Sequence, residues 1–130
     1  MILIPSKDSS YIAYAPIIHV EGAFYVIGGR TGSTYDSKTI ARLDSVSYEW
    51  SKAGDLISGR CGHNAIFDGS NIIVIGGKTG TLKTEKCSIV EDKVTCVEQE
   101  PSLVNYYQYP EIFLVEEDYC KEWPSVWLFK

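Results

Sequence analysis

The chain has 130 residues, of which 45% are hydrophobic and 22% charged, a composition that suits one globular domain with a packed core. Its net charge of −5 argues against general affinity for nucleic acid, because such affinity depends on neutralising phosphates with Lys and Arg. No apolar stretch reaches the roughly 18 residues of a membrane helix. Met1–Pro5 lacks the basic start of a signal peptide, so none is expected.

The first part of the chain predicts four short strands. Pro16 lies in the first of them and predicts an edge or irregular strand, because proline has no amide donor. A tight turn at Glu21-Gly22 leads into the second, which ends at Gly28-Gly29, where glycine permits a positive φ. The four predicted strands are Tyr11–Val20, Ala23–Ile27, Ile40–Leu43 and Val46–Trp50.

The same order begins again after a connection over Gly54–Arg60. The second set of predicted strands is His63–Phe67, Asn71–Ile75, Thr84–Ile89 and Lys93–Val97. Turns are expected at Asp68-Gly69-Ser70 and at Glu91-Asp92. A third unit opens with Glu111–Val115. Helical spacing is not evident, so the chain is expected to be all-β and built of four-stranded antiparallel meanders.

The two sets of strands share a motif. The sequences FYVIGG at 24–29 and IIVIGG at 72–77 lie 48 residues apart, and each continues with a basic residue, Thr and Gly. An apolar run closed by two glycines at this period is expected of propeller blades. Complete propellers have about 4–8 blades. We therefore expect a partial propeller, with blades at about 11–52 and 60–98, part of a third at about 103–120, and a tail at 121–130 of uncertain structure.

The repeat resembles the kelch repeat. The residues that carry the resemblance are Gly28, Gly29, Gly76, Gly77, Leu43, Asp44, Tyr48, Trp50, Leu56, Arg60 and His63. The glycines and Trp50 would be structural. The second repeat departs from the pattern, because Glu98 stands where a counterpart of Trp50 is expected, and the third unit has no glycine pair. The resemblance implies blades around a central channel that typically bind other proteins; a few relatives, such as the galactose oxidase group, are enzymes.

The cysteines suggest one disulfide. Cys87 and Cys96 flank a short turn on neighbouring strands, so they could lie within the roughly 7 Å that a bridge requires. Cys61 and Cys120 would form a second pair, less securely, and buried thiols remain the alternative. Bridges would indicate an oxidising, extracellular compartment, and their absence a cytoplasmic one. Zinc is disfavoured because no Cys-x-x-Cys spacing occurs.

Catalytic signals are weak. His19 and His63 lie 44 residues apart at strand ends and are interpreted as structural. Two histidines at this separation are too few ligands for a redox-metal site. An acidic turn is interpreted as solvated, with contact to a cation or basic partner as the alternative; it comprises Glu111, Glu116, Glu117 and Asp118. We expect no cofactor or metal and no enzymatic activity; an enzyme related to the galactose oxidase group is an alternative for the chain.

One set of loops is the candidate binding surface. In a meander, the loops after the second strand and the connections between blades share one face. The residues placed there are Arg30, Arg60, Lys78, Tyr106, Tyr107 and Tyr109. Tyr and Arg are enriched in interface hot spots, so a noncatalytic protein-binding module is the leading hypothesis. Alternatively, the tyrosines only pack between blades. For the chain as a whole, the alternative is that it self-associates or forms part of a larger propeller, because open blades leave uncovered edges.

Overall fold

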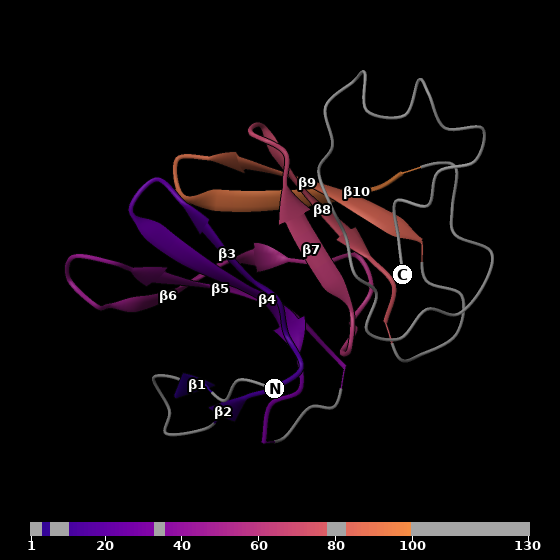
Figure 1. Cartoon of the computed structure of the whole chain (residues 1–130), viewed down its shortest axis with the longest axis horizontal. Helices are drawn as coiled ribbons and strands as arrows, with labels where there is room; N and C mark the ends of the chain where they lie inside the picture. Colours follow the sequence, from indigo (N-terminus) through magenta and orange to yellow (C-terminus); the bar gives the residue numbers. More distant parts are fainter. Residues whose placement is uncertain (1–3, 6–10, 33–35, 78–82, 100–130) are drawn as a thin grey trace, which may run out of the picture.

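The computed structural model describes residues 4–5, 11–32, 36–77 and 83–99, and these contain strands and turns without a helix (Figure 1). Strands β1 (Ile4–Pro5) and β2 (Tyr11–Ile12) pair as a small separate sheet. The remaining strands form one eight-stranded sheet in the order β3-β4-β5-β6-β10-β9-β8-β7. The all-β prediction is therefore confirmed. Among the described residues, no helix is long and apolar enough to span a membrane.

The first four strands of this sheet are an antiparallel meander, which we call the first meander. Its strands are β3 (Ile17–Val20), β4 (Ala23–Gly29), β5 (Ser37–Asp44) and β6 (Trp50–Asp55). The segment around Pro16 is irregular, as predicted, and β3 lies at an edge of the sheet. The prediction of a strand over Val46–Trp50 is wrong. The carboxylate of Asp44 accepts the amides of Val46 and Ser47, both at 2.9 Å, which stabilises a turn and delays the strand to Trp50.

The other four strands are a second antiparallel meander. They are β7 (Asn64–Phe67), β8 (Asn71–Ile75), β9 (Thr84–Val90) and β10 (Lys93–Gln99). All four coincide with predicted strands to within two residues. The glycine pairs lie at the same place in both meanders, at the end of the second strand. The predicted third unit and the tail at 121–130 lie outside the described residues.

The meanders meet at their last strands. β6 and β10 pair in parallel through Gly54 with Val94 and Asp55 with Thr95. A Cβ atom at Gly54 would lie 2.1 Å from the carbonyl oxygen of Val94, so only glycine permits this approach. The first and last strands of the sheet, β3 and β7, also contact each other. The sheet is therefore nearly closed and barrel-like.

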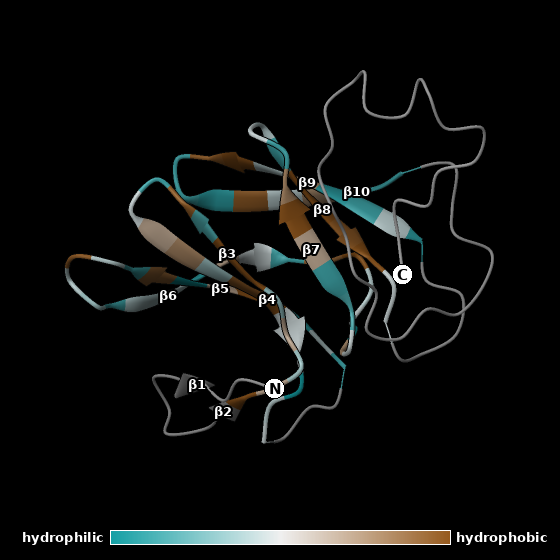
Figure 2. Ribbon diagram, in the orientation of Figure 1, coloured by the Kyte–Doolittle hydropathy of each residue, from teal (hydrophilic) through white to brown (hydrophobic). Residues whose placement is uncertain are grey.

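The hydrophobic core lies between the two meanders. The first contributes Tyr25, Ile27 and Ile40, and the second contributes Ile72, Val74 and Cys87, all 2% exposed or less. Figure 2 shows the hydrophobic residues along β4 and β8, the strands that end in the glycine pairs. Burying each large apolar side chain contributes about 1.5–3 kcal/mol, so this shared core holds the meanders together.

Candidate functional site

The glycine pairs end their strands with backbone that other residues rarely adopt. All four glycines have positive φ, with 61° at Gly28, 94° at Gly29, 77° at Gly76 and 141° at Gly77. A Cβ atom at Gly29 would lie 2.6 Å from that of Ala15. The amide of Gly29 also donates to the carbonyl of Arg60 at 2.8 Å. The structural role predicted for Gly28 and Gly29 thus has a physical basis, because they let the residues before β3 and the connection between the meanders pass close to β4.

Three segments converge at the end of the sheet where the glycine pairs lie, and we call this the loop end. They are the start of the segment after β4, the connection 56–63 between the meanders, and the described residues of the segment between β8 and β9, which are Gly76, Gly77 and Lys83. Arg60 links all three. Its backbone accepts from Gly29 and donates to Ser37, and its guanidinium donates to the carbonyls of Gly76 at 3.0 Å and Lys83 at 2.9 Å. The described parts of these segments thus lie at one end of the sheet, whereas most residues of the predicted binding surface lie outside the described part of the chain.

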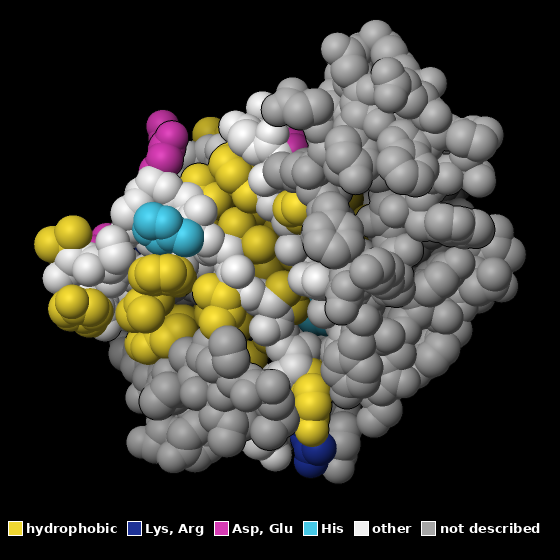
Figure 3. Space-filling view, in the orientation of Figure 1, with side chains coloured by type: hydrophobic (Ala, Val, Ile, Leu, Met, Phe, Trp, Pro, Cys, Tyr) yellow, Lys and Arg dark blue, Asp and Glu magenta, His cyan; other side chains and the backbone are white. Residues whose placement is uncertain are grey.

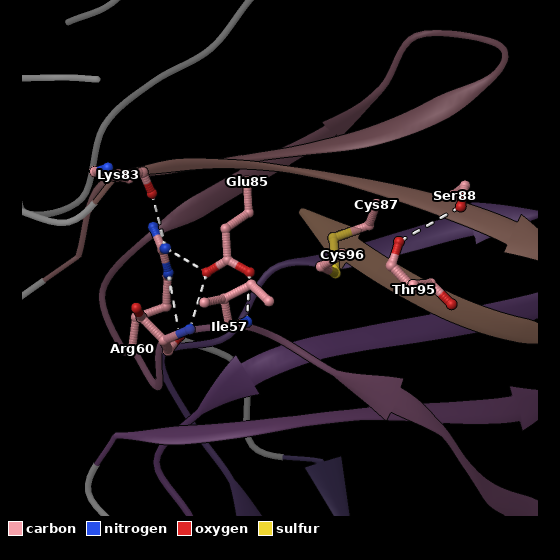
Figure 4. Close-up of a disulfide and its surroundings, with 9 residues drawn as sticks. Ile57, Arg60, Lys83, Glu85, Cys87, Ser88, Thr95 and Cys96 are labelled. Carbon is pink, nitrogen blue, oxygen red and sulfur yellow. Dashed lines mark hydrogen bonds and ion pairs between the residues drawn. A yellow bond between two sulfur atoms is a disulfide. The ribbon is translucent and has the colours of Figure 1, made fainter. Parts of the chain in front are cut away.

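Beneath the loop end lies a buried ion pair, shown in Figure 4. Arg60 and Glu85 are both fully buried, with 2.5 Å between Nη2 of Arg60 and Oε2 of Glu85. The carboxylate also accepts the amides of Ile57 at 2.6 Å and Ser58 at 3.2 Å. Burial lowers the pKa of the Arg60 guanidinium, against the raising effect of Glu85. The pair attaches the connection between the meanders to β9, the strand that contains Glu85.

Arg60 is therefore not a surface contact, and its placement on the binding surface was wrong. The sequence pattern placed Arg60 at the correct end of the sheet but did not show whether its side chain is buried or exposed. Glu85 was missed altogether, although it alternates with Cys87 and Ile89 along one strand and so shares their inward face. An acidic residue at an inward position is a signal for a buried basic partner.

His63 lies under the same connection and is structural, as predicted. Its Nε2 donates to the carbonyl of Ile27 at 2.7 Å, which leaves Nδ1 buried without a hydrogen-bond partner among the described residues. Burial and the charge of Arg60 lower the pKa of His63 to about 4, against the raising effects of the hydrogen bond to Ile27 and of Asp36. The ring is therefore neutral at pH 7. His19, by contrast, is exposed, and its ring centre lies 4.7 Å from that of Phe24.

Arg30 is the predicted surface residue that the structure places at the loop end with an exposed side chain. Its backbone pairs with Ala13 through two hydrogen bonds of 2.7 and 2.8 Å, which anchors the start of the segment after β4. The other predicted surface residues lie outside the described part of the chain; they are Lys78, Tyr106, Tyr107 and Tyr109. The acidic residues from Glu111 to Asp118 also lie outside it.

A disulfide joins Cys87 and Cys96, as the sequence predicted. The two residues are directly opposite each other on β9 and β10, and their Cα atoms lie 4.0 Å apart. Both are buried in the core. Cys61 is buried as well, and Cys120 lies outside the described residues, so the second predicted pair is untested. The bridge fits an oxidising compartment.

The register of the two meanders corrects the alignment of Trp50. Leu43 pairs with Phe24 and with Trp50, whereas Cys87 pairs with Ile72 and with Cys96. The counterpart of Trp50 is therefore Cys96, and not Glu98 as predicted. The stretch from Ile72 to Cys87 is four residues shorter than that from Phe24 to Leu43, and the β9–β10 hairpin is two residues longer, so the counterpart of Trp50 lies two residues earlier than the fixed 48-residue offset predicts.

Comparison with known proteins gives no further guide: no family model matches the chain, and no curated protein matches it significantly. Within the described residues, no group of three or more His, Cys, Asp and Glu side chains is arranged to hold a metal ion. The interpretation of the site therefore depends on the geometry of the loop end.

Proposed function

We propose that this chain is a noncatalytic, kelch-like propeller module that binds another protein through its loop end. The observation that carries this proposal is the convergence of three segments on the Arg60–Glu85 pair. Binding residues are disproportionately found on loops that a rigid scaffold positions. The loop end has that arrangement, since the sheet and the buried ion pair support it from below.

Two equivalent meanders with glycine pairs at matching positions support the propeller part of the proposal. Each meander has four antiparallel strands, the number found in a propeller blade. The described residues hold two such units, fewer than the 4–8 of a complete propeller, so this part of the chain would supply part of a ring. The kelch assignment depends on the sequence pattern alone.

Arg30 is the residue that we propose contacts the partner. The residue is exposed at the loop end, and arginine is well suited to recognise carboxylates because its planar fork can form two parallel hydrogen bonds. Lys78 holds the equivalent position in the second sequence motif and would add a second positive charge. A partner that presents acidic side chains fits both. The Cys87–Cys96 bridge favours an extracellular setting for this contact.

Site-specific photo-crosslinking in the cells that express the protein tests the proposal. A photoreactive amino acid at position 30 is compared with one at position 93, because Lys93 is exposed and begins β10 at the opposite end of the sheet. We expect protein adducts from position 30 that are lost when Lys78 is replaced by Glu. Equal adducts from both positions, or none from position 30, would exclude the loop end as the contact.

A further inference from the structure

The two meanders pack together through opposite faces of the same repeat. Side chains alternate along a strand, so Tyr25 and Phe24 lie on opposite faces of β4. Tyr25 is 2% exposed and belongs to the core, whereas Phe24 is 38% exposed. In the second repeat the assignment is reversed, because Ile72, the counterpart of Phe24, is fully buried in the core. The contact is therefore head-to-tail, and each meander keeps one face that this junction does not use.

The unused face of the first meander carries a row of directly paired side chains, which we call the first open row. It consists of His19, Phe24, Leu43 and Trp50. The counterpart of this row in the second meander is buried at the junction. It consists of Phe67, Ile72, Cys87 and Cys96. The second meander thus uses this row to contact the first meander, whereas the equivalent row of the first meander, the first open row, is partly exposed.

The second meander has the complementary face. Its outward row, the second open row, is Ile66, Ile73, Lys86 and Val97. In register it corresponds to the row of the first meander that faces the junction, which is Ile18, Tyr25, Arg42 and Ser51. Val97 is 56% exposed, and Ile66 and Ile73 are half-buried. Figure 3 shows apolar side chains gathered over the first meander beside a histidine.

From this register we infer that two copies of the chain associate, the first open row of each packing on the second open row of the other. A head-to-tail contact either closes into a ring or continues as a fibre. The described residues of two copies supply four meanders, the smallest number of blades in known propellers, so closure of these meanders is expected with two copies. The inference rests on the propeller arrangement proposed above but not on any partner at the loop end.

The mass of the intact chain in solution, measured by sedimentation at increasing concentration, tests the inference. We expect a discrete dimer. Phe24→Glu and Val97→Glu should each raise the dissociation constant more than about tenfold, because each buries a charge in one open row. Val46→Glu is the matched control, since Val46 is 85% exposed in a turn outside both rows. Unchanged circular dichroism and melting would show that the variants fold.

A mixing experiment distinguishes head-to-tail from symmetric contact. The Phe24→Glu chain keeps its second open row and the Val97→Glu chain keeps its first. An equimolar mixture should therefore form dimers at concentrations at which each variant alone is monomeric. The inference would be overturned if the wild-type protein had the mass of a single chain at every concentration, or if its mass kept growing with concentration. It would also be overturned if the mixture of the two variants stayed monomeric. Filling of the second open row by residues 100–130 of the same chain would give the monomeric result. Photo-crosslinking from position 30 is independent of all these outcomes.

Discussion

The carboxylate of Glu85 and the guanidinium of Arg60 meet in the fully buried space between the connection 56–63 and the second meander. Removing one member of a buried pair leaves the other charge without compensation, which typically costs about 3–5 kcal/mol. Glu85→Gln should therefore lower the free energy of unfolding by roughly 3 kcal/mol in chemical denaturation. Glu98→Gln is the control, because Glu98 and its partner Lys83 are more than 40% exposed and such pairs contribute at most about 1 kcal/mol. Equal effects of the two substitutions would contradict this role for Glu85.

The Cys87–Cys96 bridge closes a short loop between β9 and β10. By loop-closure entropy, replacing both residues with alanine should lower the free energy of unfolding by roughly 2–3 kcal/mol. Peptide mapping without reduction should recover the two cysteines in linked fragments. Reductant should destabilise the wild-type chain more than the double variant, and an equal response of both would argue against the bridge.

Gly54 sets the distance between the two meanders. In Gly54→Ala the new Cβ atom would lie 2.1 Å from the carbonyl of Val94, so β6 and β10 must separate. We expect a loss of roughly 1–3 kcal/mol of stability, as for other overpacking substitutions. Gly69→Ala is the comparison, because its Cβ would meet no atom within 4 Å but Gly69 has a φ of +100°. The Gly54 variant should lose hydrogen-exchange protection at the β6–β10 junction, whereas the Gly69 variant should lose none there.

His63 should make stability fall on acidification. Its pKa is about 4 in the folded chain and 6.5 in the unfolded chain, so below pH 6.5 the unfolded chain binds a proton that the folded chain does not. The free energy of unfolding should therefore decrease between about pH 6.5 and pH 4, by up to about 3 kcal/mol for this group. His63→Gln keeps an amide donor for the carbonyl of Ile27 and should lose this part of the pH dependence. Parallel stability curves for the two proteins would show that His63 does not titrate in this way.

The strands and glycine turns could be predicted because they are encoded locally. The apolar runs that end at Gly29 and Gly77 specify buried strands and a backbone turn without any knowledge of tertiary contacts. Residues 46–49 were mispredicted as strand because the turn is stabilised by the side chain of Asp44, which competes with the β-propensity of Val46 and Tyr48.

The candidate site was harder to predict, because the burial of a side chain depends on tertiary contacts. Arg60 was placed at the correct end of the sheet, but its burial depends on Glu85, which is 25 residues away in sequence. The opposite-face packing was also not evident from periodicity. Alternation along β4 and β8 identifies two faces, both largely apolar, and only the register shows that the meanders use different ones.

The most direct test of the opposite-face packing is a nuclear Overhauser spectrum of the chain with labelled glycine, valine, isoleucine and phenylalanine. The account predicts cross-peaks between the backbone protons of Gly54 and Val94, and protection of the Ile72 methyl groups from a soluble paramagnetic agent while the Phe24 ring is broadened. Broadening of Ile72 together with protection of Phe24, or absence of the Gly54–Val94 cross-peaks, would contradict it.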